Sequence, residues 1–566
     1  MRSLRANFVG TTILGVYLSV SGCTENKVSP GETTQPTAPW FEEQAKLRGL
    51  DFQHQSGHTE RYLFPEIVGG GAALADLDGD GDLDAYLVQS GRLFTDDAPG
   101  NQLFLNDGDG YFEEAAGGDA ADNGYGMGVT AGDYDNDGDI DLYVTNFGPN
   151  VLLRNNGKGE FEDVSVVAGV DHSGWGTAAV FLDLDVDGDL DLFVVNYVNW
   201  SLETEQDCLG EKTGLVDYCA PMNYGAPAGD LLYRNNGDGT FTDISEEAGL
   251  STAFGNGLGV IGADFNGDGL TDIFVANDAM MNQLWLNRGD LRFENEALIW
   301  GCAVDGHGIA KAGMGVAAVD HDNDGDTDLL VVNLAGQTDS FFRNEGSYFV
   351  DATVSVGLTT VTKRYTRFGV LLADFDNDTQ LDLFEANGAV THSPEVASED
   401  DYAEPNLLLQ GLTTKSFKQV EPLSSTSTSL TYTSRGMAMG DIDNDGGLDL
   451  LIVNRDGPAN LLMNQIGSRS QWIRFEILNA NGHDAHGATV SANVGSLRVH
   501  RDVQTAGSYL ASNDPRVHFG LGSESQVRNV VVRWPGGVVE EFGDFKAGQT
   551  VQLRQNARLA SKKEKD

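Results

Sequence analysis

Seven segments of the chain carry acidic side chains at alternate positions of a nine-residue loop, and we call them acidic loops one to seven. The first runs Asp76-Leu77-Asp78-Gly79-Asp80-Gly81-Asp82-Leu83-Asp84. The others begin at Asp133, Asp183, Asp264, Asp320, Asp374 and Asp441. Alternate residues of a tight loop turn their oxygens inward, and Ca²⁺ takes six to eight oxygen ligands at about 2.3–2.6 Å. One such segment would also suit a solvated Asx-rich turn, but seven in register predict calcium sites.

The expected ligands are the side chains at positions one, three, five and nine, joined at position seven by a further carboxylate or by a main-chain carbonyl. In loop one these are Asp76, Asp78, Asp80, Asp82 and Asp84, with the Asp82 carbonyl as a backbone ligand. In loops two to five they are Asp133, Asp135, Asp137, Asp139, Asp141, Asp183, Asp185, Asp187, Asp189, Asp191, Asp264, Asn266, Asp268, Asp272, Asp320, Asp322, Asp324, Asp326 and Asp328. In loops six and seven they are Asp374, Asp376, Asp378, Asp382, Asp441, Asp443, Asp445 and Asp449. The chain would thus bind up to seven Ca²⁺ ions.

Two of the acidic loops depart from this pattern. Position six is where the loop must reverse, and glycine reaches positive φ there without a Cβ penalty. Thr379 takes that position in loop six, and Asn266 replaces an acid in loop four. We therefore expect loops one, two, three and five to hold Ca²⁺ most tightly.

The residues on either side of the acidic loops have the character of β-strands. A helix-flanked calcium loop needs a bidentate Glu at position twelve, where this chain has Leu87, Val144 or Val194. Gly-rich apolar runs precede the loops, and β-branched apolar runs follow them. Each unit then carries Asn-x-Leu-x-x-Asn, a glycine turn and an aromatic residue, as at 150–161, which predicts a hairpin of strands three and four. Four strands recurring at about 55 residues predict an all-β fold, a seven-bladed β-propeller.

These loops between glycine-rich strands resemble the FG-GAP and VCBS repeats of integrin α-type propellers. Downstream, Gly-Ser-Tyr-Leu at 507–510, Asp-Pro-Arg-Val-His-Phe-Gly-Leu-Gly at 514–522 and Val-Arg-Trp-Pro-Gly-Gly at 532–537 are similar to the ASPIC/UnbV domain of the cartilage acidic protein family. The resemblance covers about residues 40–555. It implies a propeller at 40–466 with calcium on loops at one end of its blades, a small β-rich domain at 470–555 and a charged tail at 556–566. His486 stands where the family has an aliphatic residue, and we expect it at the surface.

The N-terminus predicts export. Arg2 and Arg5 precede an apolar stretch from Phe8 to Val20, which is short for a membrane span and typical of a signal peptide at 1–22. The sequence Val20-Ser21-Gly22-Cys23 resembles a bacterial lipobox, which implies lipidation of Cys23. By the family rules for such signals, Thr24 after the cysteine favours the outer membrane. The alternative is an ordinary signal peptide with an incidental cysteine. Residues 23–39, with three prolines among Ser and Thr, predict a flexible tether.

Charge and cysteine content agree with an exported protein. The formal net charge is −51, from 86 acidic and 35 basic residues, which argues against nucleic acid or anionic lipid as a direct partner of the folded body. We expect contact with the membrane only through the lipid anchor. The spacing of Cys208 and Cys219 suits a disulfide in an oxidising compartment, although two free thiols are the alternative. Cys302 is left over, and we expect it to be buried in a blade.

The motifs predict a binding protein rather than an enzyme. His54 and His58 lack a third metal ligand nearby, and the clustered carboxylates have calcium spacing. We expect a calcium-binding module for adhesion or for binding a protein or glycan at the face opposite the acidic loops. Insertions would form that site: residues 197–229, with Tyr197, Trp200, Tyr218 and Tyr224, and residues 388–405, with His392, Glu395, Glu399, Asp400, Asp401 and Glu404. Two alternatives stay open: the insertions only cover the channel or pack the C-terminal domain, or the protein is a carbohydrate-active enzyme, a polysaccharide lyase or hydrolase.

Overall fold

The computed structural model describes residues 39–95, 99–210, 212–392, 400–420 and 430–557. The expected signal peptide at 1–22, Cys23, the tether up to residue 38 and the tail from residue 558 lie outside the described residues. Glu395 and Glu399 also lie outside them. None of the described helices combines the length and the apolar composition of a membrane-spanning segment.

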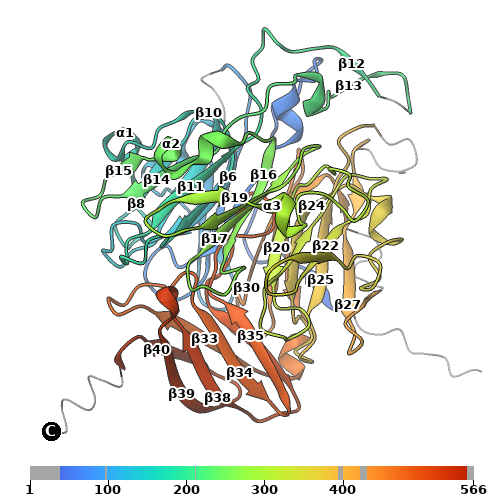
Figure 1. The fold of residues 1–566 in the computed structure, drawn as a ribbon. Coiled ribbons are helices and arrows are strands. Elements are labelled where there is room, and N and C mark those ends of the chain that lie inside the picture. Colours follow the sequence, from blue (N-terminus) through green and yellow to red (C-terminus); the bar gives the residue numbers. More distant parts are fainter. Residues whose placement is uncertain (1–38, 96–98, 211, 393–399, 421–429, 558–566) are drawn as a thin grey trace, which may run out of the picture. The chain divides into compact units, whose positions relative to one another are not determined.

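Most of the described residues before position 465 lie in seven four-stranded antiparallel units, the blades (Figure 1). Pairing of residues 173–175 with residues 147–149 also joins blades two and three in one sheet. Blades one to three comprise β2 (Ala72–Ala75), β3 (Asp84–Leu87), β4 (Gln102–Asn106) and β5 (Phe112–Ala115); β6 (Tyr125–Gly132), β7 (Asp141–Pro149), β8 (Val151–Asn155) and β9 (Phe161–Asp163); and β10 (Ser173–Leu182), β11 (Asp191–Asn196), β14 (Leu231–Asn235) and β15 (Phe241–Asp243). Blades four and five comprise β16 (Gly257–Ala263), β17 (Asp272–Asn277), β18 (Gln283–Asn287) and β19 (Phe293–Asn295), then β20 (Val316–Val319), β21 (Asp328–Val331), β22 (Ser340–Asn344) and β23 (Phe349–Asp351). Blades six and seven comprise β24 (Arg367–Ala373), β25 (Asp382–Asn387), β27 (Leu407–Gly411) and β28 (Phe417–Gln419), then β30 (Ser434–Gly440), β31 (Asp449–Asn454), β32 (Asn460–Asn464) and β1 (Phe41–Glu43). The predicted all-β, seven-bladed propeller is confirmed.

The first two strands of each blade are almost wholly buried. Their short apolar runs suit strands covered on both faces, here by the neighbouring blades. Short helices follow the fourth strands of blades two to four: α1 (Ser165–Ala168), α2 (Ser245–Ala248) and α3 (Ala297–Trp300). Each of the three helices ends at a glycine with φ between 78° and 98°, the left-handed conformation of a helix C-terminus.

The seventh blade is completed by the N-terminal end of the described chain. Strand β1 pairs antiparallel with β32, with Phe41 opposite Asn464 and Glu43 opposite Leu462. The first and last blades are thereby joined by segments that lie more than 400 residues apart in the sequence. Main-chain pairing with the last blade thus closes the ring, as expected for a propeller, whose blades keep only short outer edges.

The C-terminal domain consists of two small sheets (Figure 1). One places β33 (Gln471–Leu478) between β37 (Val517–Gly522) and β40 (Thr550–Arg554). The other has the order β35 (Leu497–Asp502), β34 (Thr489–Val494), β38 (Gln526–Arg533) and β39 (Val539–Lys546). Phe475, Val490, Val532 and Trp534 belong to the hydrophobic core that the two sheets share.

Residues 503–516 leave the C-terminal domain and contact the inner strands of the propeller, and we call this segment the tongue. Its short strand β36 (Ala511–Ser512) pairs parallel with β2 of blade one. Ser508 exchanges main-chain hydrogen bonds with Val316 of blade five, at 2.7 and 3.0 Å. The hydroxyl of Tyr509 donates to the carbonyl of Val68 at 3.0 Å, and Tyr509 is fully buried. The tongue therefore fills space between the inner strands that a ligand would otherwise enter.

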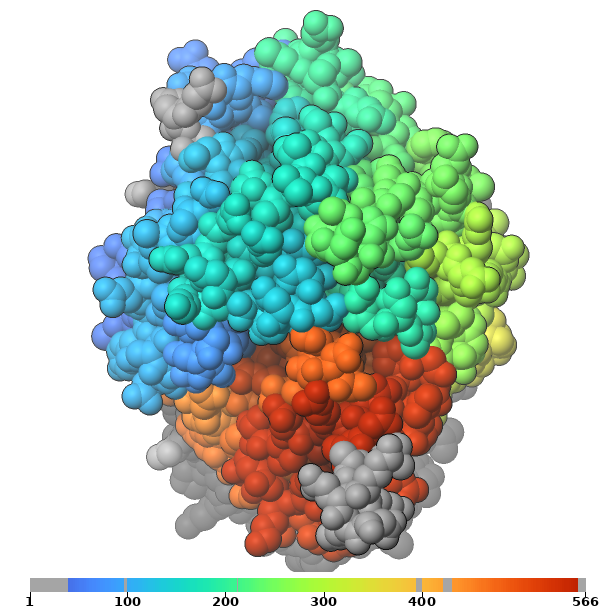
Figure 2. All heavy atoms as spheres, turned by 90° about the vertical axis from the view of Figure 1, so that its left-hand side faces the viewer, coloured from blue at the N-terminus to red at the C-terminus, as the bar shows by residue number. Residues whose placement is uncertain are grey.

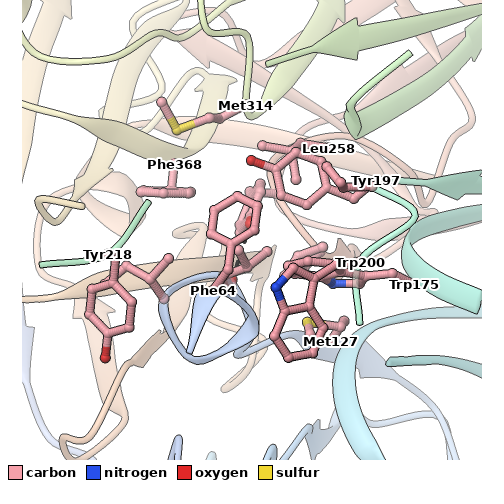
Figure 3. Packing of buried hydrophobic residues seen from close by; sticks show 14 of the residues in the cluster. Phe64, Met127, Trp175, Tyr197, Trp200, Tyr218, Leu258, Met314 and Phe368 are labelled. Atoms are coloured by element: carbon pink, nitrogen blue, oxygen red, sulfur yellow. Dashed lines mark hydrogen bonds between the residues drawn. The ribbon is translucent and has the colours of Figure 1, made fainter. Parts of the chain in front are cut away.

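A hydrophobic layer lies at the other end of the inner strands, away from the acidic loops. Figure 3 shows how its side chains pack. It combines residues from the beginnings of those strands, such as Met127 and Phe368, with Phe64 of the 3₁₀-helix η1 (Phe64–Ile67). Tyr197, Trp200 and Tyr218 of the first insertion belong to the same layer. Their exposed fractions are 2, 6 and 4 %, so our expectation that they serve as ligand anchors is wrong: they cover the channel.

The two insertions meet at this end of the propeller. The first contains the hairpin β12 (Cys208–Leu209) and β13 (Val216–Asp217), and the second contributes β26 (Glu404–Pro405), which pairs with β29 (Thr431–Tyr432). His392 Nδ1 lies 3.2 Å from Asp217 Oδ2, and the Tyr402 hydroxyl donates to Asp217 Oδ1 at 2.8 Å. The buried Asp217 carboxylate thus joins the second insertion to the first.

Candidate metal centres

Each acidic loop connects the first strand of a blade to the second, so all seven lie at one end of the propeller, which we call the acidic-loop face. Position six has φ between 84° and 100° in every loop, as at Gly81 and Gly325. Thr379 takes this left-handed conformation too, at φ 84°, and its amide still donates to Asp374 Oδ2 at 2.7 Å. Loop six therefore keeps the shape of the others in spite of its threonine.

The aspartate at position nine fastens the loop to its own blade. In loop one, Asp84 accepts hydrogen bonds from the amides of Leu77 and Asn106, both at 2.8 Å. The same pair of bonds recurs at Asp141, Asp191, Asp272, Asp328, Asp382 and Asp449. Because each of these residues begins the second strand, the carboxylate ties loop, second strand and third strand together.

The second asparagine of the Asn-x-Leu-x-x-Asn signature joins neighbouring blades. Asn155 of blade two donates from its side-chain amide to the carbonyl of Leu77, at position two of loop one, at 2.8 Å. Equivalent bonds of 2.8–2.9 Å run from Asn106, Asn235, Asn287, Asn344 and Asn464 to the preceding blade. Blade six has Gly411 at this position, and there Lys415 Nζ donates to the carbonyl of His321 at 3.0 Å instead. All seven loops are thus linked in a closed ring.

Carboxylates converge inside the loops. Asp76, Asp78 and Asp84 each place an oxygen within 4.8 Å of the other two. The same holds for Asp133, Asp135 and Asp141, for Asp183, Asp185 and Asp187, for Asp320, Asp322 and Asp324, and for Asp374, Asp376 and Asp382. Several carboxylate oxygens of the acidic loops are buried and have no hydrogen-bond partner among the described residues: Oδ1 of Asp78, Asp135, Asp183, Asp322, Asp441 and Asp443.

The crowded, partly buried carboxylates of the loops favour a bound cation. Burial raises the pKa of Asp84 to about 8 and that of Asp141 to about 9, since leaving water penalises the charged carboxylate. The neighbouring aspartates raise both pKa values further, whereas hydrogen bonds from main-chain amides lower them. Hard carboxylate and carbonyl oxygens in this number suit Ca²⁺. The residues present therefore fit the metal that their spacing predicts.

The cysteines and His486 are not among the expected acidic-loop ligands. Cys208 and Cys219 form a disulfide with a Cα–Cα distance of 5.2 Å, and Cys302 is buried as expected. His486 is only 4 % exposed, so our expectation of a surface position is wrong. It lines cavities of about 210 and 450 Å³ between the acidic loops and the C-terminal domain.

Two groups of residues at this face were not identified from the sequence. The interblade asparagines belong to the predicted hairpin signature, but nothing in that signature shows that their partners lie in the preceding blade. Arg474, Arg533 and His483 of the C-terminal domain contact loops seven, four and two. Arg533 lies within the Val-Arg-Trp-Pro-Gly-Gly motif at 532–537, but that motif does not show that the side chain reaches loop four. Arg474 and His483 lie outside the motifs that the sequence offers.

Comparison with known proteins agrees with both parts of the chain. Residues 76–144, 133–194, 213–275, 264–331 and 320–385 match the FG-GAP-like repeat family, and residues 479–560 match the ASPIC and UnbV family. Cartilage acidic protein 1 of Xenopus tropicalis is 27% identical over 310 residues, which are 53% of this chain and 44% of that protein. The human protein of that name is 28% identical over 305 residues, which are 52% of this chain and 43% of that protein. The chain thus matches less than half the length of these relatives.

Solved structures with a similar arrangement are more distant in sequence. A lectin of Agrocybe aegerita that recognises non-reducing terminal N-acetylglucosamine is 16% identical, with a TM-score of 0.39, over 69% of this chain and 86% of the lectin. YCF48 bound to D1 peptide is 11% identical, with a TM-score of 0.38, over 73% of this chain and 94% of that chain. The FG-GAP-like matches alone span more than half of the sequence. This protein therefore belongs to the family of FG-GAP-repeat propellers that carry a C-terminal ASPIC and UnbV domain.

Proposed function

We propose that this protein is an exported, calcium-binding lipoprotein whose propeller binds a protein or glycan partner. The observation that carries the calcium assignment is the set of buried carboxylate oxygens that converge within the acidic loops without a hydrogen-bond partner in the described chain. Charges arranged in this way repel one another unless a cation lies between them. Because position nine and the interblade asparagines join these loops to the blades, the ions would stabilise the whole ring.

Metal analysis of the purified protein tests the calcium assignment. After equilibration with Ca²⁺ and removal of free ions, we expect several and at most seven calcium ions per chain. A triple variant of one loop, with Asp76, Asp78 and Asp80 changed to Asn, should bind one ion fewer. A wild-type protein that retains no calcium would refute the assignment.

The face opposite the acidic loops is the part of the propeller that we propose for the partner. The C-terminal domain contacts the other face, and the tongue occupies the space between the inner strands. A surface cavity of about 270 Å³ is formed by residues from the free ends of blades one and two, including Phe94, Phe147, Arg92 and Asn123. Phe94 is 62 % exposed and has φ 61°, a strained conformation that is often associated with binding sites. An exposed aromatic ring beside a guanidinium and an amide suits a glycan or a polar peptide segment.

A glycan array and a pull-down with the lipid-free protein would identify the partner class. Phe94→Ala should then weaken binding by at least tenfold without changing the calcium content. Tyr348→Ala provides a matched control, because Tyr348 is 50 % exposed but lies in the turn between β22 and β23, on the acidic-loop face. Equal loss of binding in both variants, or in neither, would place the partner elsewhere.

Lipidation at Cys23 is the remaining part of the proposal, and it rests on the Val-Ser-Gly-Cys sequence that ends the apolar N-terminal stretch. Cells grown with a labelled fatty acid should label the wild-type protein and locate it in the outer membrane fraction. Cys23→Ala should abolish the label, whereas Cys302→Ala should not. Label retained in the Cys23 variant would show that the cysteine is incidental.

A further inference from the structure

The C-terminal domain places basic side chains directly on the acidic loops. Arg474 NH1 lies 3.0 Å from Asp441 Oδ2 in loop seven, and Arg533 NH1 lies 2.8 Å from Asp264 Oδ2 in loop four. His483 Nδ1 lies 2.5 Å from Asp133 Oδ2 in loop two. Three acidic loops thus receive a basic partner at position one, always on the same carboxylate oxygen. Figure 2 shows the C-terminal residues, in orange and red, against the propeller residues in blue and green.

We propose that these side chains are positioning residues for calcium, so that the C-terminal domain sets the calcium affinity of loops two, four and seven. This proposal rests on the proposed calcium binding and adds that the C-terminal domain regulates its affinity. A partner that holds one oxygen of a ligating carboxylate fixes the direction of the other oxygen, and losing such a partner typically costs 10- to 100-fold in metal affinity.

Loop seven shows the arrangement in most detail. Besides the ion pair of Arg474 NH1 with Asp441, Arg474 NH2 donates to Asn444 Oδ1 at 2.8 Å. Arg48, from the N-terminal segment, donates to Asp443 Oδ2 at 3.2 Å. The Arg474 side chain is 3 % exposed and the Asp441 side chain is fully buried. Oδ1 of Asp441 and Oδ1 of Asp443 are buried without a hydrogen-bond partner in the described residues. One oxygen of Asp441 and one of Asp443 therefore contact an arginine, and the other oxygen of each is available to bind a metal.

Each of these loops has enough negative charge to balance both a Ca²⁺ ion and its basic partner. Loop four has only three carboxylates, at Asp264, Asp268 and Asp272, so that one Ca²⁺ and Arg533 together balance it. Loop seven has four carboxylates, which one Ca²⁺ balances together with Arg48 and Arg474. Loop two has five carboxylates, so it stays negative when Ca²⁺ binds. Since no loop becomes positive, the basic groups need not be expelled when the metal binds.

Docking of the C-terminal domain and calcium binding by the acidic loops should each favour the other. Gly536 N donates to the carbonyl of Gly269 in loop four at 2.9 Å, and Gly522 N donates to the carbonyl of Asn377 in loop six at 2.7 Å. These bonds require the loops to keep their folded shape, which the ions would stabilise. A ligand that favours the docked state must by linkage bind more tightly when the domain is docked.

The test compares calcium titrations of the full chain and of point variants, using a chelating indicator as competitor. Arg474→Gln and Arg533→Gln should each weaken one class of site at least tenfold and leave the other sites unchanged. Arg498→Gln is the matched control, since Arg498 donates hydrogen bonds to Ser491, Asn493 and Asn529 within the C-terminal domain. Hydrogen exchange of peptides covering 441–449 should become faster in Arg474→Gln and remain unchanged in the control.

The outcomes separate this inference from the proposed function. If the wild type binds calcium and Arg474→Gln binds it equally well or more tightly, the arginine does not position the site and the inference is overturned. If the wild type binds no calcium, the proposed function itself fails and the inference fails with it. Arg474→Lys is a second variant, in case Arg474→Gln fails to fold. Lysine keeps the positive charge but cannot contact both Asp441 and Asn444 as the guanidinium does, so we expect a calcium affinity between those of the wild type and Arg474→Gln.

Discussion

The side-chain amide of Asn106 in blade one donates a hydrogen bond of 2.9 Å to the main-chain carbonyl of Ile442, in the acidic loop of blade seven. This contact closes the ring of interblade bonds at the point where the first and last blades meet. Strand β1 joins the same two ends of the propeller through main-chain pairing with β32. The acidic loops are therefore part of the mechanism that holds the ring together, as well as candidate metal sites.

Removal of one interblade asparagine should destabilise the whole propeller. Asn155→Ala removes the two bonds of 2.8 Å that the side-chain amide donates to the carbonyls of Leu77 and Ile140. It also removes the bonds that Oδ1 accepts from the amides at 156 and 157. Leaving these buried carbonyls without a donor should cost about 2–4 kcal/mol of unfolding free energy. Asn156→Ala, at the exposed neighbouring position, should cost less than about 0.5 kcal/mol. Urea unfolding measures both, and equal midpoints would contradict the role of the ring.

The aspartate at position nine should matter to both stability and metal content. Asp141→Ala leaves the amides of Tyr134 and Asn155 without their acceptor, at a cost of about 2–5 kcal/mol. The variant should also bind one calcium ion fewer. Asp238→Ala, at an exposed turn outside the acidic loops, serves as the control. Unchanged calcium content in Asp141→Ala would show that loop two does not bind the metal.

Thr379→Gly should stabilise the protein. Thr379 has φ 84°, where a side chain with a Cβ is strained, and relief of that strain should contribute about 1 kcal/mol. Thr379→Ala keeps the Cβ and should give no such gain. Thermal unfolding of the two variants distinguishes them. A Tm that rises equally in both would mean that backbone strain is not the cause.

The buried His54 should make the protein sensitive to mild acid. Burial lowers the pKa of His54 to about 4, opposed by the carboxylate of Asp456 and helped by Arg455 and Arg435. The unfolded chain has a histidine pKa of about 6.5, so between pH 6.5 and 4 the unfolded state binds the extra proton. The stability that a neutral His54 contributes is complete above about pH 6.5 and is lost as the pH falls toward 4.

Substitution of His54 tests the predicted loss of stability at lower pH. Between pH 6 and 5 the unfolding free energy of the wild type should fall by about 1 kcal/mol per pH unit more than that of His54→Gln. His307→Gln is the control, because His307 is an exposed histidine. A wild-type slope no steeper than that of the His54 variant would refute the assignment.

The repeated Asp and Asn spacing was enough to predict the blade, the number of blades and the loop that joins the first two strands. Contacts between distant segments could not be predicted in this way. Phe41–Glu43 has no repeat signature of its own, so its place in blade seven is decided only by the partner strand. Trp200 and His486 looked exposed because nothing in the sequence shows which surface covers them. Arg474 lies on loop seven only because the C-terminal domain docks there.

Thermal unfolding of the full chain with calcium and with an excess of chelator tests the central claim most directly. Each occupied site should contribute about 2.7 kcal/mol when free Ca²⁺ exceeds its Kd a hundredfold. With several such sites in one closed ring, we expect Tm to fall by roughly ten degrees or more after metal removal, and to recover when Ca²⁺ is restored. An unchanged Tm in a sample that metal analysis shows to be calcium-free would contradict the claim that the acidic loops hold the propeller together through calcium.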